Sequence, residues 1–373
     1  MSPSTQQSHI YSYTCNTQPH FTSTHTTPND PIDKTPLFVD NSPSYFDHIN
    51  GELNKYFEFD GCKTLTHFLG TSYEQTPQGL LLHNEPLITA AAAAAGVLHA
   101  NPKHPLFPPG ATITDTTSTP EEVNEYTWGF RNVLGVLSWI SQHTRPDFPF
   151  HMSSLASKQA SPNKNDFQLL KRVAKYANTT KQYRQSLERS DAYLRGGPPS
   201  EWRLRLNGPV DSDYAGCPVT RKCMSGLNIT LNDATDTTFP LSTSVPVVSR
   251  ANRQPTVSTS VNEGEVKAAT SGAKSLVYLD SVLRFMDDNV DTPRLHCDNK
   301  GAIDIAHGIG KRKRSKHIDI KHFYIRELIT QGKLSLHHVG TNDNVSDAMT
   351  KSLGRTKFNK FRTLLSVILP ESP

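Results

Sequence analysis

Four acidic residues in the second half of the chain are the side chains best suited to chemistry: Asp211, Glu265, Asp298 and Asp347. Carboxylate oxygens are the ligands that Mg²⁺ prefers, and four of them can hold two ions against a phosphodiester and promote its hydrolysis. Three of them also have an ordinary alternative. Asp211 can end a strand, Glu265 can sit in the first turn of a helix, and Asp347 can be an N3 residue opposite an Asn344 cap. The surrounding residues must decide between these roles.

The elements around these carboxylates are predicted to form an α/β domain. Alternating patterns predict strands at 202–206 and 227–231, and Val245 to Val248 predicts a third strand that Pro246 places at a sheet edge. Beyond them we expect, in order, a helix at 263–286, a short strand ending at Asp298, helices at 299–307 and 318–331, a strand at 334–339 and a last helix from Asn344. That order describes a mixed sheet covered by helices.

The first half of the chain is predicted to be a low-complexity tail followed by a helical region. Residues 1–44 are rich in Ser, Thr, Pro, His and Asn with little apolar periodicity, so we expect a disordered tail. Apolar stripes predict helices at 126–142 and 165–176, and the alanine run at 90–95 favours another. The polar, Gly- and Pro-bearing stretch at 190–200 predicts a domain boundary.

Bulk properties narrow the function classes. The 373 residues carry a net charge of +4, which is compatible with a polyanionic partner. Five cysteines without a Cys-x-x-Cys pair argue against a structural zinc site and favour reduced thiols in an intracellular protein. No apolar stretch is long enough to predict a membrane-spanning helix.

Six blocks of residues carry a resemblance to a known family. They are Asp-Ser-Asp-Tyr-Ala-Gly-Cys-Pro at 211–218, Met-Ser-Gly at 224–226, Arg-Gln-Pro-Thr-Val-Ser-Thr-Ser-Val-Asn-Glu-Gly-Glu at 253–265, Cys-Asp-Asn-Lys-Gly-Ala-Ile at 297–303, Lys-Arg-Ser-Lys-His-Ile-Asp-Ile at 313–320 and Ser-Asp-Ala-Met-Thr-Lys at 346–351. In this order they resemble the RNase H domain of copia-type LTR retrotransposon polyproteins. Thr144-Arg-Pro-Asp147 and Lys171 to Tyr176 resemble the end of the reverse transcriptase of the same family.

The resemblance implies a fold and a domain order. An RNase H-like mixed five-stranded sheet with flanking helices is expected at 200–369, preceded at 45–190 by a partial reverse-transcriptase palm, thumb and connection. The catalytic segments of the polymerase lie upstream of these blocks in the family, so we expect a C-terminal fragment of a polyprotein without reverse-transcriptase activity. Phe285-Met-Asp-Asp288 matches a polymerase-like pattern but ends a helical run, so we assign it no metal role.

The resemblance also implies a reaction. Asp211, Glu265, Asp298 and Asp347 match the catalytic, metal-binding carboxylates of the family, which would hold two Mg²⁺ ions, with Mn²⁺ as a substitute, and hydrolyse the RNA strand of RNA–DNA hybrids. Asp213 is expected to be only a neighbour of Asp211.

Four positions beside the first two carboxylates depart from the family pattern and are expected to loosen their geometry: Pro209, Val210, Gly264 and Val266. The alternative function is therefore a catalytically inactive or co-opted transposon remnant that binds nucleic acid or protein partners.

Basic residues supply the expected contact with nucleic acid. They are Lys311, Arg312, Lys313, Arg314 and Lys316, followed by His317. Such a run tracks phosphates without regard to sequence, although a solvated loop or a nuclear-localisation run is the alternative. Asn299 is expected to donate to a 2′-hydroxyl of the hybrid. His337 and His338 fall in a predicted strand and are expected to be structural. Other retrotransposon proteins are further expected partners, in cytoplasmic virus-like particles or in the nucleus.

Overall fold

In a computed structural model the chain separates into two compact units, residues 1–75 and residues 76–373. The structure describes residues 9–15, 37–40, 51, 55, 59–101, 106–107, 113, 118–188, 203–217, 219–235, 244–286, 289–308 and 316–370, with backbone alone for 9–15, 37–40, 59–64 and 316–322. No helix in these ranges is long and apolar enough to cross a membrane.

The first unit contains short antiparallel strands. β1 (His9–Cys15) lies between β2 (Leu37–Asp40) and β3 (Phe59–Thr64), and β4 (His67–Phe68) pairs with β5 (Thr71–Thr76). The structure thus has two strands in the stretch at 1–44 where the composition predicted disorder. β1 is the sequence His-Ile-Tyr-Ser-Tyr-Thr-Cys, whose β-branched and aromatic residues favour strands over the polar surroundings. The other residues of that stretch lie outside the described residues.

The second unit begins with strand β6 (Gly79–His83) and a group of helices. Its helices are α2 (Glu85–Ala94), α3 (Pro120–His143), α4 (Pro149–Ala156) and α5 (Lys164–Thr179). Capping boxes at Thr119 and Asn163 start α3 and α5, in which both predicted apolar stripes are buried. Helix α4 was not predicted, because its eight residues are too short for a clear apolar period. Strand β7 (Arg184–Glu188) follows and pairs with β6.

A second sheet of five strands confirms the predicted mixed architecture. Its strands are β8 (Leu204–Asp213), β9 (Met224–Asp233), β10 (Val245–Arg253), β11 (Arg294–Cys297) and β12 (Ser335–His338). Their order in space is β10-β9-β8-β11-β12, with β8 antiparallel to β9 and β11 parallel to both β8 and β12. This is the RNase H-like arrangement that the resemblance implied, and β10 lies at the edge, as Pro246 predicted.

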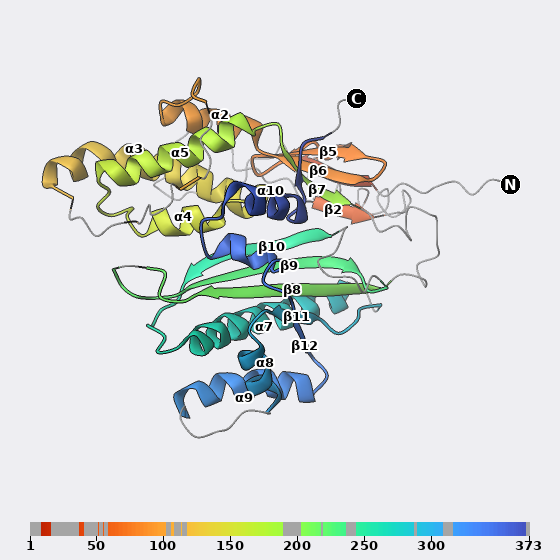
Figure 1. Cartoon of the computed structure of the whole chain (residues 1–373). Helices are drawn as coiled ribbons and strands as arrows, with labels where there is room; N and C mark the ends of the chain where they lie inside the picture. Colours follow the sequence, from red (N-terminus) through yellow and green to blue (C-terminus); the bar gives the residue numbers. More distant parts are fainter. Residues whose placement is uncertain are drawn as a thin grey trace. The chain divides into compact units, whose positions relative to one another are not determined.

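Helices cover both faces of this sheet (Figure 1). They are α7 (Val261–Met286), α8 (Lys300–His307), α9 (Lys316–Thr330), the short 3₁₀ helix η2 (Val345–Met349) and α10 (Arg355–Leu364). Val210 and Leu227 point to α7, where a Cβ on Gly272 would lie 2.6 Å from Val210 Cγ1. Because side chains alternate along a strand, Asp211 and Gly226 point to the other face, which η2 covers. The expected last helix is thus divided into η2 and α10.

One hydrophobic core joins the helices of the first half to the C-terminal elements. Phe130, Leu170 and Tyr176 are buried with Met349 and Phe361 in the same cluster. The ring of Tyr176 also meets that of Phe358, with centroids 5.5 Å apart. Strand β13 (Val367–Ile368) returns to pair with β7. The segment that carries Asp347 is therefore supported by α3 to α5 as well as by the sheet.

Candidate metal centre

Asp211 lies near the end of the central strand β8, with 4% of its surface exposed. Pro209 precedes it and was expected to disturb the strand. The pairing with β9 nevertheless keeps one register, from Asn207 opposite Thr230 to Val210 opposite Leu227. The proline thus removes a donor without shifting the strand that presents Asp211.

Glu265 is presented by the start of α7, which packs closely on β8. A Cβ on Gly264 would lie 2.9 Å from Ser212 Oγ, so the absence of a side chain at 264 permits this approach. The Ser212 amide donates a hydrogen bond to the Glu265 carboxylate. Gln254 fixes the same junction, because its Nε2 donates to Gly264 O and Ser225 Oγ, both at 2.9 Å. Gln254 thus holds this junction, and the loosening expected from Gly264 stays a prediction.

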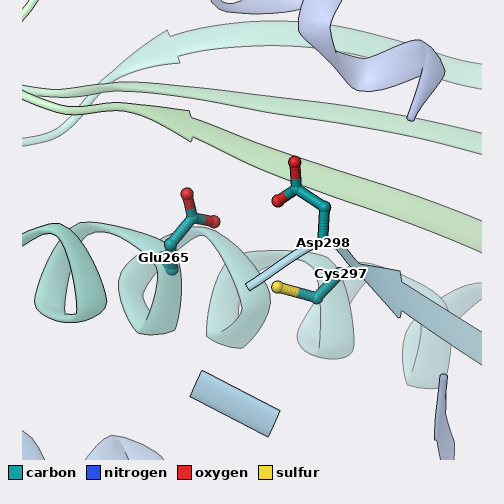
Figure 2. Close-up of side chains that lie close together, drawn as sticks. All are labelled: Glu265, Cys297 and Asp298. Carbon is teal, nitrogen blue, oxygen red and sulfur yellow. The ribbon is translucent and has the colours of Figure 1, made fainter. Parts of the chain in front are cut away.

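Asp298 follows the end of β11 and faces Glu265. Ligand atoms of Glu265, Cys297 and Asp298 all lie within 4.8 Å of one another. Figure 2 shows the carboxylates of Glu265 and Asp298 reaching up from α7 and from the end of β11, whereas the Cys297 thiol points in a different direction from the Asp298 carboxylate. Burial, and then the charge of Glu265, raises the pKa of the Cys297 thiol. A protonated thiol is a poor ligand, so the two carboxylates are the cation-binding groups of this trio.

Asp347 is brought to the sheet by the side chains that precede it. Asn344 Nδ2 donates to Val210 O at 2.9 Å, and Ser346 Oγ donates to Pro209 O at 2.6 Å. Gly226 makes room for this docking, because a Cβ there would lie 2.6 Å from Ser346 O. Asn344 caps η2 as expected, with its side chain accepting from Ser346 N.

Lysine side chains engage the carboxylate of Asp347, which is fully buried. Lys351 Nζ lies 2.7 Å from Asp347 Oδ1 and 4.0 Å from Asp211 Oδ2. Lys357 Nζ forms an ion pair with Asp347 Oδ2, and Thr350 Oγ1 donates to Asp211 Oδ2. These contacts link Asp211 to Asp347 through one ammonium and one hydroxyl.

Burial and neighbouring charges disfavour the ionised forms of Glu265 and Asp211. Burial, followed by the charges of Asp211 and Asp298, raises the pKa of Glu265 to about 9. Burial raises the pKa of Asp211 to about 7, with Lys351 opposing the rise and Asp347 adding to it. Glu265 Oε2 is buried without a hydrogen-bond partner among the described residues. A divalent cation would supply positive charge here, and the carboxylates of Glu265 and Asp298, which are close enough to share one ion, fit a hard metal ion, with the charge of Asp211 beside them.

The structure thus brings together all four predicted carboxylates, since the charges of Asp298 and Asp347 both act on Asp211 and those of Asp211 and Asp298 act on Glu265. The ordinary role proposed for Glu265 falls instead to Glu263, the acidic residue in the first turn of α7.

The predicted nucleic-acid contacts are less fully described. Asn299 caps α8, and its Nδ2 donates to Asn262 Oδ1 at 3.1 Å. Residues 311–314 lie outside the described residues, and Lys316 and His317 begin α9 with only their backbone described. His337 lies in β12, as predicted, with its ring beside that of His296.

Four residues of the site escaped the sequence analysis: Gln254, Thr350, Lys351 and Lys357. The first three stand inside or beside the family blocks, but nothing in their spacing shows which carboxylate each one contacts. Lys357 lies outside every block, and its contact with Asp347 depends on the turn between η2 and α10.

Comparisons with known proteins find relatives over most of the chain. The chain is 25% identical over 340 residues to the retrovirus-related Pol polyprotein from transposon RE1 of Arabidopsis thaliana, which covers 89% of this chain and 21% of that protein. It is 23% identical to the Pol polyprotein from transposon TNT 1-94 of Nicotiana tabacum, over 89% of this chain and 24% of that protein. The chain thus spans less than a quarter of the length of these relatives.

No protein-family model matches the chain. Among solved structures, the foamy viral protease-reverse transcriptase in complex with an RNA/DNA hybrid aligns with 84% of this chain and 35% of that chain, at 10% identity and a TM-score of 0.41. The sequence relationship is the informative one, and it extends over both halves of the chain. This protein is a homologue of the copia-type Pol polyproteins of retrotransposons.

Proposed function

We propose that residues 200–369 form a divalent-metal-dependent ribonuclease that hydrolyses the RNA strand of RNA–DNA hybrids. The observation that carries the proposal is the convergence of three acidic residues, Glu265, Asp298 and Asp211, of which Glu265 and Asp211 are buried and have raised pKa values. Burying an unpaired carboxylate costs free energy, so a sequence that gathers several of them favours a bound cation in return.

The residues of the chain have distinct roles in this reaction. Glu265 and Asp298 would hold a magnesium ion together with Asp211, and the bound ion would polarise the scissile phosphate and lower the pKa of an attacking water. Thr350 and Lys351 hold the Asp211 carboxylate on the side facing η2. Gln254 holds α7 against β8 and so fixes Glu265 relative to Asp211. The chain thereby preorganises the carboxylates before substrate arrives.

We further infer that the hybrid is held mainly through phosphates. Lys311 to Arg314, Lys316 and His317 would supply sequence-independent contacts, and Asn299, which lies next to Asp298, would face the minor groove of the hybrid. Residues 45–190 would be the end of a reverse transcriptase, and α3 to α5 share a core with η2 and α10. In this proposal the helical half supports the nuclease half.

A cleavage assay tests the function directly. The full chain is incubated with a labelled RNA–DNA hybrid, and with duplex DNA and single-stranded RNA as substrate controls, at increasing Mg²⁺ or Mn²⁺. We expect cutting of the hybrid alone, dependent on the metal and lost in Asp298→Asn. Asp304→Asn is the matched control, because Asp304 is an exposed aspartate on the neighbouring helix α8. Absence of cutting at every metal concentration would refute the proposal, and hybrid binding without cutting would favour the alternative of an inactive remnant.

A further inference from the structure

The cationic side chains at Asp347 distinguish this carboxylate from the others. Each of its two oxygens is already engaged by an ammonium, Oδ1 by Lys351 at 2.7 Å and Oδ2 by Lys357. The contact of Lys351 with Oδ1 is an ion pair alone, because Asp347 Oδ1, like Glu265 Oε2, has no hydrogen-bond partner among the described residues. The four carboxylates therefore form two halves: Asp347 and Asp211 make ion pairs with lysine side chains, and Glu265 and Asp298 make none among the described residues.

Lys351 occupies a particular place within the first half. Its Nζ lies between two carboxylates that approach from different elements, Asp347 on η2 and Asp211 on β8. Two carboxylates from separate segments commonly bind a single metal cation. An ammonium between them attracts both in the same way, with one positive charge where a divalent ion has two. The ammonium is also removable, because the side chain of Lys351 is 41% exposed and ends a flexible four-carbon stem.

The positions of the two lysines point the same way. Lys351 and Lys357 both pair with Asp347, whereas Glu265 and Asp298 pair with no lysine among the described residues. A divalent cation can therefore bind at Glu265 and Asp298 without displacing an ammonium. A second divalent cation beside Lys351 would instead face an ammonium across about 4 Å, and the two like charges would repel each other strongly at a partly buried site.

We propose that Lys351 is a built-in substitute for one of the two divalent cations implied by the family resemblance. In the resting protein one divalent ion binds, at Glu265, Asp298 and Asp211, and a second enters between Asp211 and Asp347 only when the Lys351 ammonium leaves. Lys351 thus sets the number of divalent ions that bind. It contacts no reacting atom. This inference rests on the proposed metal-dependent function.

Counting bound ions tests the inference without recourse to activity. Mn²⁺ alone is titrated into the full chain, and free Mn²⁺ is measured by electron paramagnetic resonance. We expect one tight ion in the wild type. In Lys351→Met, which keeps the length of the side chain and removes its charge, a second ion should bind at least about ten-fold more tightly than in the wild type.

Three controls sharpen the measurement. Lys351→Arg keeps the charge and should behave as the wild type. Lys360→Met removes an exposed lysine of α10 that pairs with Asp343, away from the carboxylate cluster, and should also leave the stoichiometry unchanged. Asp298→Asn should weaken the single tight ion, because it removes a ligand from the half without lysines.

The outcomes separate this inference from the function on which it rests. Two equally tight ions in the wild type, or the same titration in Lys351→Met and wild type, would overturn the role of Lys351 and leave the nuclease proposal standing. A count of two equally tight ions in the wild type overturns the inference by itself, and Lys351→Arg, which keeps the charge, shows whether changes at this position disturb folding. Absence of any Mn²⁺ binding would overturn both proposals.

Discussion

Replacing Glu265 by glutamine is expected to stabilise the metal-free protein although it removes a proposed metal ligand. The pKa of Glu265 is raised to about 9, mainly by burial and then by Asp211 and Asp298, whereas its ordinary value is 4.5. For a group whose pKa is raised on folding, the folded protein binds the proton more tightly than the unfolded chain. The resulting stability is fully present below pH 4.5 and is lost as the pH rises towards 9.

The size of the effect follows from that window. Above the pKa of Glu265 in the unfolded chain, the free energy of unfolding of the wild type falls by about 1.4 kcal/mol for each pH unit. At pH 8 this loss has an upper limit of about 5 kcal/mol. The coupled carboxylates share this penalty, so we expect a gain on the order of 2 to 3 kcal/mol for Glu265→Gln. Glutamine does not titrate, it can still accept from the Ser212 amide, and its NH₂ group can donate to a neighbouring carboxylate. At pH 5 the gain should fall below about 1 kcal/mol.

Urea unfolding of the full chain in EDTA at pH 5 and pH 8 measures this difference. The matched control is Glu263→Gln, on the same helix two residues earlier. Glu263 pairs with Lys267 at 2.8 Å and accepts from Thr259 N at 2.7 Å, and its pKa is lowered to about 2 with these contacts opposing the effect of burial. Its replacement should destabilise the protein by about 1 to 2 kcal/mol at pH 8. Opposite signs at 263 and 265 are the expected result.

Two results would refute the reasoning. One is a Glu265→Gln variant that is less stable than the wild type in EDTA at pH 8. The other is equal stabilisation of the variant and the wild type by added Mg²⁺, because a ligand that binds only the folded state should favour the protein that has the carboxylate.

Three further changes test how the site is assembled. Gly226→Ala should abolish cleavage and lower the melting temperature, because the added Cβ would lie 2.6 Å from Ser346 O. Gly354→Ala is the control: its Cβ would have no atom within 4 Å, so cleavage and melting temperature should stay unchanged. Gln254→Leu should cost about 1 to 3 kcal/mol in urea unfolding and reduce cleavage, because it leaves Gly264 O and its other acceptors without their donor; an unchanged unfolding midpoint would contradict this role. Neutralising Lys311 to Arg314 should weaken hybrid binding and flatten its dependence on salt, and an unchanged salt slope would exclude phosphate contacts there.

Much of the fold could be predicted because its signals are local. The apolar stripe of α7 and the alternation in β9 are visible within one segment, and helix or strand formation follows from such periods. Predictions failed where the local signal was weak or misleading. Helix α4, for example, is too short for a period.

The sequence by itself determined which carboxylates this protein has, the elements that carry Asp211, Glu265, Asp298 and Asp347, and the family that they resemble. Only the tertiary structure decided how these charges are shared. Burial and Coulomb interactions depend on distances between segments that are far apart in the chain, which no local pattern encodes. Folding therefore decided that Asp347 pairs with Lys351 and Lys357, while Glu265 is buried beside Asp211 and Asp298 and its pKa is raised to about 9.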